Sequence, residues 1–305
     1  MEISVVSLVS LLLALLLSPL LFGVINRTKA FFAGRRGQPL LQMYYDLGKL
    51  FRKGAVYSRT TSWVFRAGPL VGLAAVAGAL LLVPFGGARA VLSFDGDLIL
   101  FAYWLGLMRF FTVLAALDTG SAFEGMGASR EVQFSVLAEP ALLLGLAAAA
   151  RQTGHLSLSD MYAAFPAGTI ITANPALLLV GAALVLVYLA ENARIPVDDP
   201  NTHLELTMIH EVMVLDHGGP DLGLILYGAA LKLWVLGALV AGLIFPVRTG
   251  HAALDLAAGL AGLFVVAVLT GVVESVMARL RLVRVPNLLM AAGIFSVLAL
   301  VVVWR

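Results

Sequence analysis

The sequence predicts an all-α protein that crosses a membrane about eight times, organised as one integral-membrane domain over residues 1–305. Hydrophobic residues make up 61% of the chain and the mean hydropathy is +0.97, whereas soluble domains contain roughly 45–50% apolar residues. Only 12% of the residues are charged, and apolar runs of about 20 residues, long enough to cross a bilayer, recur along the chain. The chain has no cysteine, which excludes disulfides, iron–sulfur clusters and thiolate metal sites within it.

The expected spans follow one another along the whole chain. The first has Glu2 as its only early charge and lacks the positive start of a signal peptide, so we expect it to be retained. Asn174-Pro175, directly before the fifth span, favours a helix start, with asparagine as the cap and proline at the first helical position. The expected spans are Ile3–Ile25, Ala67–Phe85, Leu98–Leu117, Val132–Ala150, Ala176–Ala190, Leu222–Phe245, Leu256–Met277 and Asn287–Trp304.

A polar segment from about residue 26 to 66 follows the first span and contains nine Lys or Arg. Within it, Gln38–Lys53 repeats apolar residues at helical spacing. That apolar face holds Leu40, Tyr44, Leu47 and Phe51. The stretch is too short and too polar to span, so we expect a lateral amphipathic helix in the membrane interface.

The positions of the basic residues predict the orientation. If the N-terminus is outside, the inner loops hold fourteen Lys or Arg, whereas the outer loops and the C-terminus hold four. We therefore expect a multi-pass protein of the cell (inner) membrane with both termini outside and cytoplasmic loops at about residues 26–66 and 191–221. The net charge is only +2 and no basic patch with interleaved aromatics is present, so no nucleic-acid partner is expected.

Ionisable residues inside the expected spans are costly to bury, and each is therefore a candidate for function. These residues are Arg109, Glu139, Glu191, Lys232 and Glu274. Pro140 after Glu139 frees a backbone carbonyl one turn earlier, which favours a polar notch suited to proton relay. A structural pair between Glu139 and Arg109 or Lys232 is the alternative. Lys232 lies too deep in its span to reach either surface, so it needs a carboxylate partner.

The densest group of charges is Ala190–Asp216, which contains six carboxylates and only one basic residue, Arg194. Glu191 and Arg194 are one helical step apart, the spacing of an ion pair on a helix. Two prolines bracket Asp198 and Asp199, which predicts an extended loop whose carboxylates do not pair with each other.

A helix is expected at Thr202–Leu215. Glu205 falls on its apolar side, where burial disfavours the ionised form, so Glu205 is the strongest single candidate for a proton-carrying group. His203 and His210 fall on its polar side. Their spacing is not that of a metal-binding helix motif, and we expect no metal site.

Four stretches together carry a family resemblance. They are Gly34–Pro39 with Gln42, Asp46 and Lys49; Gly127–Glu131 with Glu139-Pro140; Ala190–Asn192 with Arg194 and Pro196; and Asp198–Pro200 continuing through Thr202–Thr207. On these motifs the chain resembles the NADH-dehydrogenase subunit 1 family over nearly its whole length. Within that family it is most similar to the branch found in group 4 membrane-bound [NiFe] hydrogenases of the formate hydrogenlyase type.

The resemblance implies a membrane anchor that docks a soluble redox arm. It also implies that the subunit transmits conformational or electrostatic changes to antiporter-like membrane subunits through a line of glutamates. The partners implied are hydrogenase-like large and small subunits and an iron–sulfur protein, which would hold the iron–sulfur clusters and the NiFe centre. This chain would be a non-catalytic subunit without a cofactor. The proton or ion pathway implied comprises Glu139, Glu191, Glu205, Lys232, Glu274, Asp198 and Asp199. The implied docking residues are Arg35, Arg36, Asp46, Lys49, Arg130, Arg194 and His203.

One departure from the family pattern concerns quinone. The quinone-dependent members that the chain resembles carry a loop of the Pro-Phe-Asp type. This chain reads Pro196-Val197-Asp198-Asp199-Pro200 instead, which disfavours a quinone site. Three alternatives stay open at this stage. They are a quinone-site subunit 1 of a respiratory complex I, a cation transporter that acts alone, and a passive anchor whose carboxylates pair only for structure. A transporter would commonly show an inverted repeat, and none is visible.

Overall fold

The computed structural model describes residues 4–165, 174–198 and 209–304, which form α-helices joined by loops and contain no strand. Seven of these helices are long and apolar enough to cross a membrane, and α7 is a shorter apolar helix of 17 residues. They match the eight expected spans, so the predicted all-α polytopic fold is confirmed. The helices are α1 (Val5–Phe32), α2 (Gln42–Leu50), α3 (Trp63–Leu82), α4 (Asp97–Asp118), α5 (Ala122–Thr153), α6 (Leu158–Ala164), α7 (Pro175–Glu191), α8 (Gly219–Ile244), α9 (Ala252–Val276) and α10 (Val285–Trp304).

The start of α7 has the predicted cap. The side chain of Asn174 accepts a hydrogen bond from the backbone N–H of Ala176 at 2.9 Å, and Pro175 occupies the first helical position. Both α1 and α5 continue through their internal prolines, Pro19 and Pro140. A proline inside a helix removes one backbone hydrogen bond, and packing against neighbouring helices offsets that loss.

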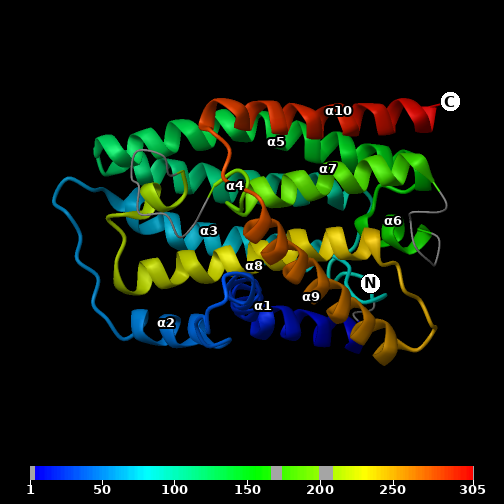
Figure 1. The fold of residues 1–305 in the computed structure, drawn as a ribbon, viewed down its shortest axis with the longest axis horizontal. Coiled ribbons are helices and arrows are strands. Elements are labelled where there is room, and N and C mark those ends of the chain that lie inside the picture. Colours follow the sequence, from blue (N-terminus) through cyan, green and yellow to red (C-terminus); the bar gives the residue numbers. More distant parts are fainter. Residues whose placement is uncertain (1–3, 166–173, 199–208, 305) are drawn as a thin grey trace.

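The bundle is organised around α8. Of the most apolar stretch of α8, 72% of the residues are buried, against 22–44% in the other six long helices, so α8 is the central helix. In Figure 1, α10 lies along α5 and α7 on one side of the bundle, and α1 and α9 lie together on the other. The end of the bundle at which α3, α5 and α8 begin also carries α2, and we call it the α2 end.

The lateral helix α2 is shorter than the predicted Gln38–Lys53 and packs against α1 and α8 (Figure 1). The hydroxyl of Tyr44 donates to the backbone carbonyl of Leu16 in α1. The approach to α1 requires a glycine at position 23, because a Cβ there would lie 2.1 Å from the carbonyl oxygen of Leu40. The segment that leads into α2 therefore lies directly on the backbone of α1.

Two predicted boundaries differ from the structure. Helix α5 begins at Ala122, ten residues before the expected Val132, because its polar first turns are covered by the turn of 3-10 helix at Glu211–Val214. The first seven residues of the helix predicted at Thr202–Leu215 lie outside the described residues. In the part that is described, the chain forms that 3-10 turn and not an α-helix, because it folds back so that its backbone N–H groups meet Asp198.

Candidate functional site

A single arginine gathers three glutamates inside the bundle. Arg109 of α4 forms ion pairs with Glu131 and Glu139 of α5 and with Glu191 at the end of α7; its Nε lies 3.1 Å from Oε1 of Glu131. The side chains of Glu131 and Glu191 are only 10% and 5% exposed, whereas that of Glu139 is 47% exposed. Burying a carboxylate costs several kcal/mol unless a cation compensates it, so Arg109 is what permits this cluster.

Lys232 of α8 extends the cluster on its other side. Its Nζ lies 2.9 Å from Oε2 of Glu191, so Glu191 is held between the lysine and Arg109. The expectation that Lys232 needs a carboxylate partner is thereby confirmed. Glu191 is the last residue of α7, a helix of 17 residues that is about 25 Å long and therefore shorter than a hydrocarbon layer of about 30 Å.

The loop after α7 is buried and forms a second centre at Asp198. One carboxylate oxygen of Asp198 accepts from the backbone N–H groups of Ile209 at 3.1 Å and His210 at 3.3 Å. The other lies 2.8 Å from the guanidinium of Arg279. Burial alone would raise the pKa of Asp198, but the contacts with His210 and Arg279 outweigh burial and hold that pKa below its usual value.

His210 joins this loop to the arginine cluster. Its Nε2 lies 3.2 Å from Oε2 of Glu131 and its Nδ1 lies 3.7 Å from Oδ2 of Asp198. Burial and the nearby Lys232 lower the pKa of His210, but Glu131 and Asp198 outweigh them and raise it above the ordinary value. The sequence placed His210 on a polar helix face and Glu131 in a family motif, but neither was among the predicted site residues, because their contact joins segments far apart in the chain.

We call the connected set Arg279–Asp198–His210–Glu131–Arg109–Glu191–Lys232, with Glu139 as a branch from Arg109, the charged axis. Each neighbouring pair lies within ion-pair distance. The axis therefore connects the loop after α7 with the interior of the bundle through consecutive ion-pair contacts.

A separate ion-pair group surrounds Glu274 of α9. Its two carboxylate oxygens lie 2.8 Å from Lys29 of α1 and 3.3 Å from Arg194. The guanidinium of Arg194 also lies over the ring of Phe22, 4.5 Å from its centroid. Arg194 therefore pairs with Glu274 and not with the nearby Glu191, and it is buried inside the protein rather than lying on a docking surface.

The other predicted site residues lie apart from these groups. Glu205, Asp199 and His203 fall outside the described residues. Arg35, Arg36 and Lys49 are exposed at the α2 end, and Asp46 accepts a hydrogen bond from Gln42 at 2.9 Å. Arg130 is half-buried near the start of α5. The α2 end thus presents an exposed basic surface.

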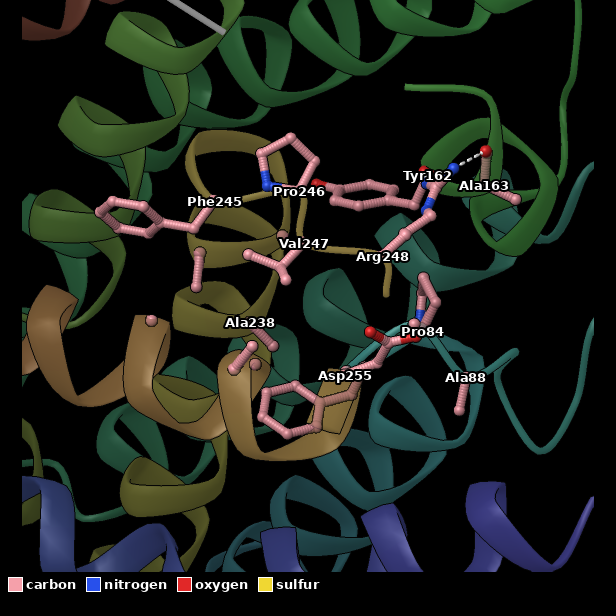
Figure 2. Close-up of a pocket in the computed structure, with 18 of the residues that line it drawn as sticks. Pro84, Ala88, Tyr162, Ala163, Ala238, Phe245, Pro246, Val247, Arg248 and Asp255 are labelled. Atoms are coloured by element: carbon pink, nitrogen blue, oxygen red, sulfur yellow. Dashed lines mark hydrogen bonds between the residues drawn. The ribbon is translucent and has the colours of Figure 1, made fainter. Parts of the chain in front are cut away.

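Two cavities differ in their relation to the charged axis. A cavity of about 80 Å³ lies at the end of the bundle opposite α2, and its wall includes Tyr162, Arg248 and Asp255 (Figure 2). Its charges are satisfied locally: Arg248 donates to the carbonyls of Tyr162 and Ala163, and Asp255 accepts from Thr249 at 2.6 Å. A larger cavity of about 390 Å³ lies between α4 and α5 and reaches Arg109, Glu139 and Glu191.

Comparisons with known proteins give one consistent result. A family model described as NADH dehydrogenase matches residues 4–304. Formate hydrogenlyase subunit 4 of Escherichia coli (strain K12) is 32% identical over 303 residues, which are 96% of this chain and 96% of that protein. Hydrogenase-4 component C of the same organism is 33% identical over 76% of this chain and 72% of its own length. A chain of the membrane-bound sulfane sulfur reductase, an archaeal respiratory membrane complex, has the same fold, with a TM-score of 0.81, 24% identity and coverage of 96% and 98% of the two chains.

Proposed function

The chain belongs to the NADH dehydrogenase family, and on that premise we propose that it anchors the soluble redox arm of an energy-converting, hydrogenase-like complex and couples that arm to proton movement. The relatives matched over most of their own length are subunits of formate hydrogenlyase and hydrogenase-4, which supports the hydrogenase branch over a quinone-site subunit of complex I. In this proposal the α2 end faces the cytoplasm and both termini lie outside the inner membrane. In the same proposal the iron–sulfur clusters and the NiFe centre belong to partner subunits, and a quinone site in this chain is disfavoured.

The observation that carries the proposal is the continuity of the charged axis. Arg109 is shared by three carboxylates, so protonation of one of them releases the guanidinium to the other two. The two ring nitrogens of His210 lie 3.2 Å from Glu131 and 3.7 Å from Asp198. Shortening of both to hydrogen-bond distance would let His210 take a proton on one side and release it on the other. A displacement of the Asp198 loop by the docked arm would change both contacts.

The basic surface at the α2 end is the proposed docking site for the arm. Arg35, Arg36 and Lys49 are exposed there, and α7, which leads into the loop that contains Asp198, runs toward the same end of the bundle (Figure 1). Contact with the arm at this end would displace the loop that contains Asp198, and so would change the end of the charged axis formed by Asp198 and Arg279. Antiporter-like subunits would respond, within the membrane, to the altered protonation and ion pairing of the charged axis.

Replacement of Glu191 by Gln tests the coupling. The change keeps the shape of the side chain but removes the charge that holds Lys232 and Arg109 together. We expect the tagged complex to assemble and retain its redox activity, while proton uptake by reconstituted vesicles, followed with a pH-sensitive dye, falls at least about ten-fold relative to turnover. Asp160→Asn is the control, because it removes a carboxylate that pairs at the surface with Arg89, far from the axis.

Unchanged proton uptake in Glu191→Gln would overturn the proposal. Mass spectrometry of the purified complex provides an independent test. Hydrogenase-like and iron–sulfur subunits should accompany the chain, whereas an NADH- or quinone-reducing module would favour a complex I role.

A further inference from the structure

Among the glutamates of the charged axis, Glu139 differs by being open to the side of the bundle. Its side chain is 47% exposed. It lies about two helical turns, or roughly 10 Å, inside the span expected at Val132–Ala150. A glutamate side chain is too short to reach the membrane surface from that depth. Glu139 thus presents a carboxylate where a lone subunit would meet hydrocarbon.

The surface around Glu139 is a groove with apolar walls. The cavity of about 390 Å³ lies here, and α4 lines it with Ile99, Tyr103, Gly106 and Phe110, which recur at helical spacing on one face. A Cβ built on Gly106 would meet nothing within 4 Å, so the middle of the groove is open. The aromatic residues on its rim, Tyr103 and Phe110, are strongly exposed. The groove is wide enough to receive a side chain from a neighbouring helix.

The hydrogen-bonding capacity of Glu139 is only partly used. A carboxylate offers about four acceptor positions. The described partner of Glu139 is Arg109, which also binds the more deeply buried Glu131 and Glu191. Lipid tails have no donor to offer, and an unsatisfied charge in hydrocarbon costs several kcal/mol. A donor from another protein segment would remove that cost.

We propose that the groove between α4 and α5 is the docking site for a membrane-spanning helix of a partner subunit, and that this helix places a lysine or arginine side chain against Glu139. The charge of that side chain complements the carboxylate, and the apolar walls fit the rest of the helix. The inference rests on the proposed function only in treating the chain as a subunit of a membrane complex. It adds the surface and the chemistry of one contact.

Crosslinking in the intact complex tests the position of the helix. The chain contains no cysteine, so Phe110→Cys creates a single thiol in it for benzophenone-4-maleimide. Ile294→Cys on α10 is the matched control, because Phe110 and Ile294 are both 57% exposed. After illumination, we expect Phe110→Cys to be joined to a peptide from a membrane-spanning segment of a co-purified subunit that contains Lys or Arg. Adducts with lipid alone or with a second copy of this chain, or the same peptide from both positions, would overturn the proposal.

Two substitutions test whether the partner helix donates a hydrogen bond to the side chain at position 139. Glu139→Gln keeps a hydrogen-bond acceptor, whereas Glu139→Leu leaves none. We expect the yield of the crosslinked product to fall about ten-fold or more in Glu139→Leu and to be largely kept in Glu139→Gln. Equal yields in the wild type and Glu139→Leu would contradict a donor contact. The crosslink needs no turnover, so its outcome is separate from that of proton uptake in Glu191→Gln.

Discussion

Replacement of Arg109 by Gln should be the most destabilising single change in the charged axis. The guanidinium holds three carboxylates, and two of them, Glu131 and Glu191, are almost fully buried. Removing one partner of a buried ion pair typically costs about 3–5 kcal/mol, because the remaining charge stays buried without compensation. A chain of this size loses roughly 2 °C of Tm per kcal/mol, so we expect a decrease of about 6–10 °C in detergent.

The assay is thermal unfolding followed by tryptophan fluorescence, with Arg89→Gln as the control. Arg89 pairs with Asp160 at 2.6 Å, but both side chains are well exposed, at 63% and 37%, and a surface pair is worth only about 0–1 kcal/mol. Arg109→Lys should give an intermediate result, because an ammonium group keeps the charge but cannot reach three carboxylates as the planar guanidinium does. Equal decreases for Arg109→Gln and Arg89→Gln would refute the reasoning.

Two further predictions concern the interface loop and the lateral helix. Because the folded-state pKa of His210 is raised, its ion pairs contribute stability that is fully present below the unfolded value of about 6.5 and is lost as the pH rises through the raised value. The Tm difference between the wild type and His210→Gln should therefore shrink as the pH rises above about 6.5, and a difference that grows with pH would contradict this assignment. Gly23→Ala should displace α2 from α1, since the new methyl group would lie 2.1 Å from the carbonyl of Leu40, and hydrogen exchange of residues 42–50 should accelerate. Gly48→Ala within α2 meets no atom within 4 Å and should leave exchange unchanged or slow it.

The spans were predictable because each is an apolar run whose length matches a bilayer. The cap at Asn174 was predictable because it depends only on neighbouring residues, Asn174 and the backbone N–H of Ala176. The early start of α5 was not, because its first turns carry the polar residues Glu124 and Glu131, whose burial depends on a segment far along the chain. Local composition cannot indicate which distant segment will cover a polar helix end.

For the candidate site too, the residues that a local signal marks were predictable and those that depend on tertiary contacts were not. The cost of burying a charge was sufficient to single out Arg109, Glu139, Glu191 and Lys232 from the sequence. It was also sufficient to require a carboxylate for Lys232, but it could not say which carboxylate. Glu131 and His210 lay outside the apolar runs, so no local signal marked them. Their role follows from tertiary contacts with Arg109 and Asp198.

The shortness of α7 has an electrical consequence. Helix α7 ends at Glu191 and, at about 25 Å, is shorter than a hydrocarbon layer of about 30 Å; the described part of the loop after it carries the charged residues Arg194 and Asp198. A membrane voltage falls mainly across the least polar part of its path. With the α2 end facing the cytoplasm, as proposed, most of the voltage drop would lie between Glu191 and the far end of the bundle. Carrying one charge across a full 100 mV corresponds to about 2.3 kcal/mol. A proton that reaches Glu191 from the α2 end would do so at little electrical cost, and nearly all the voltage-dependent work would belong to the steps that follow.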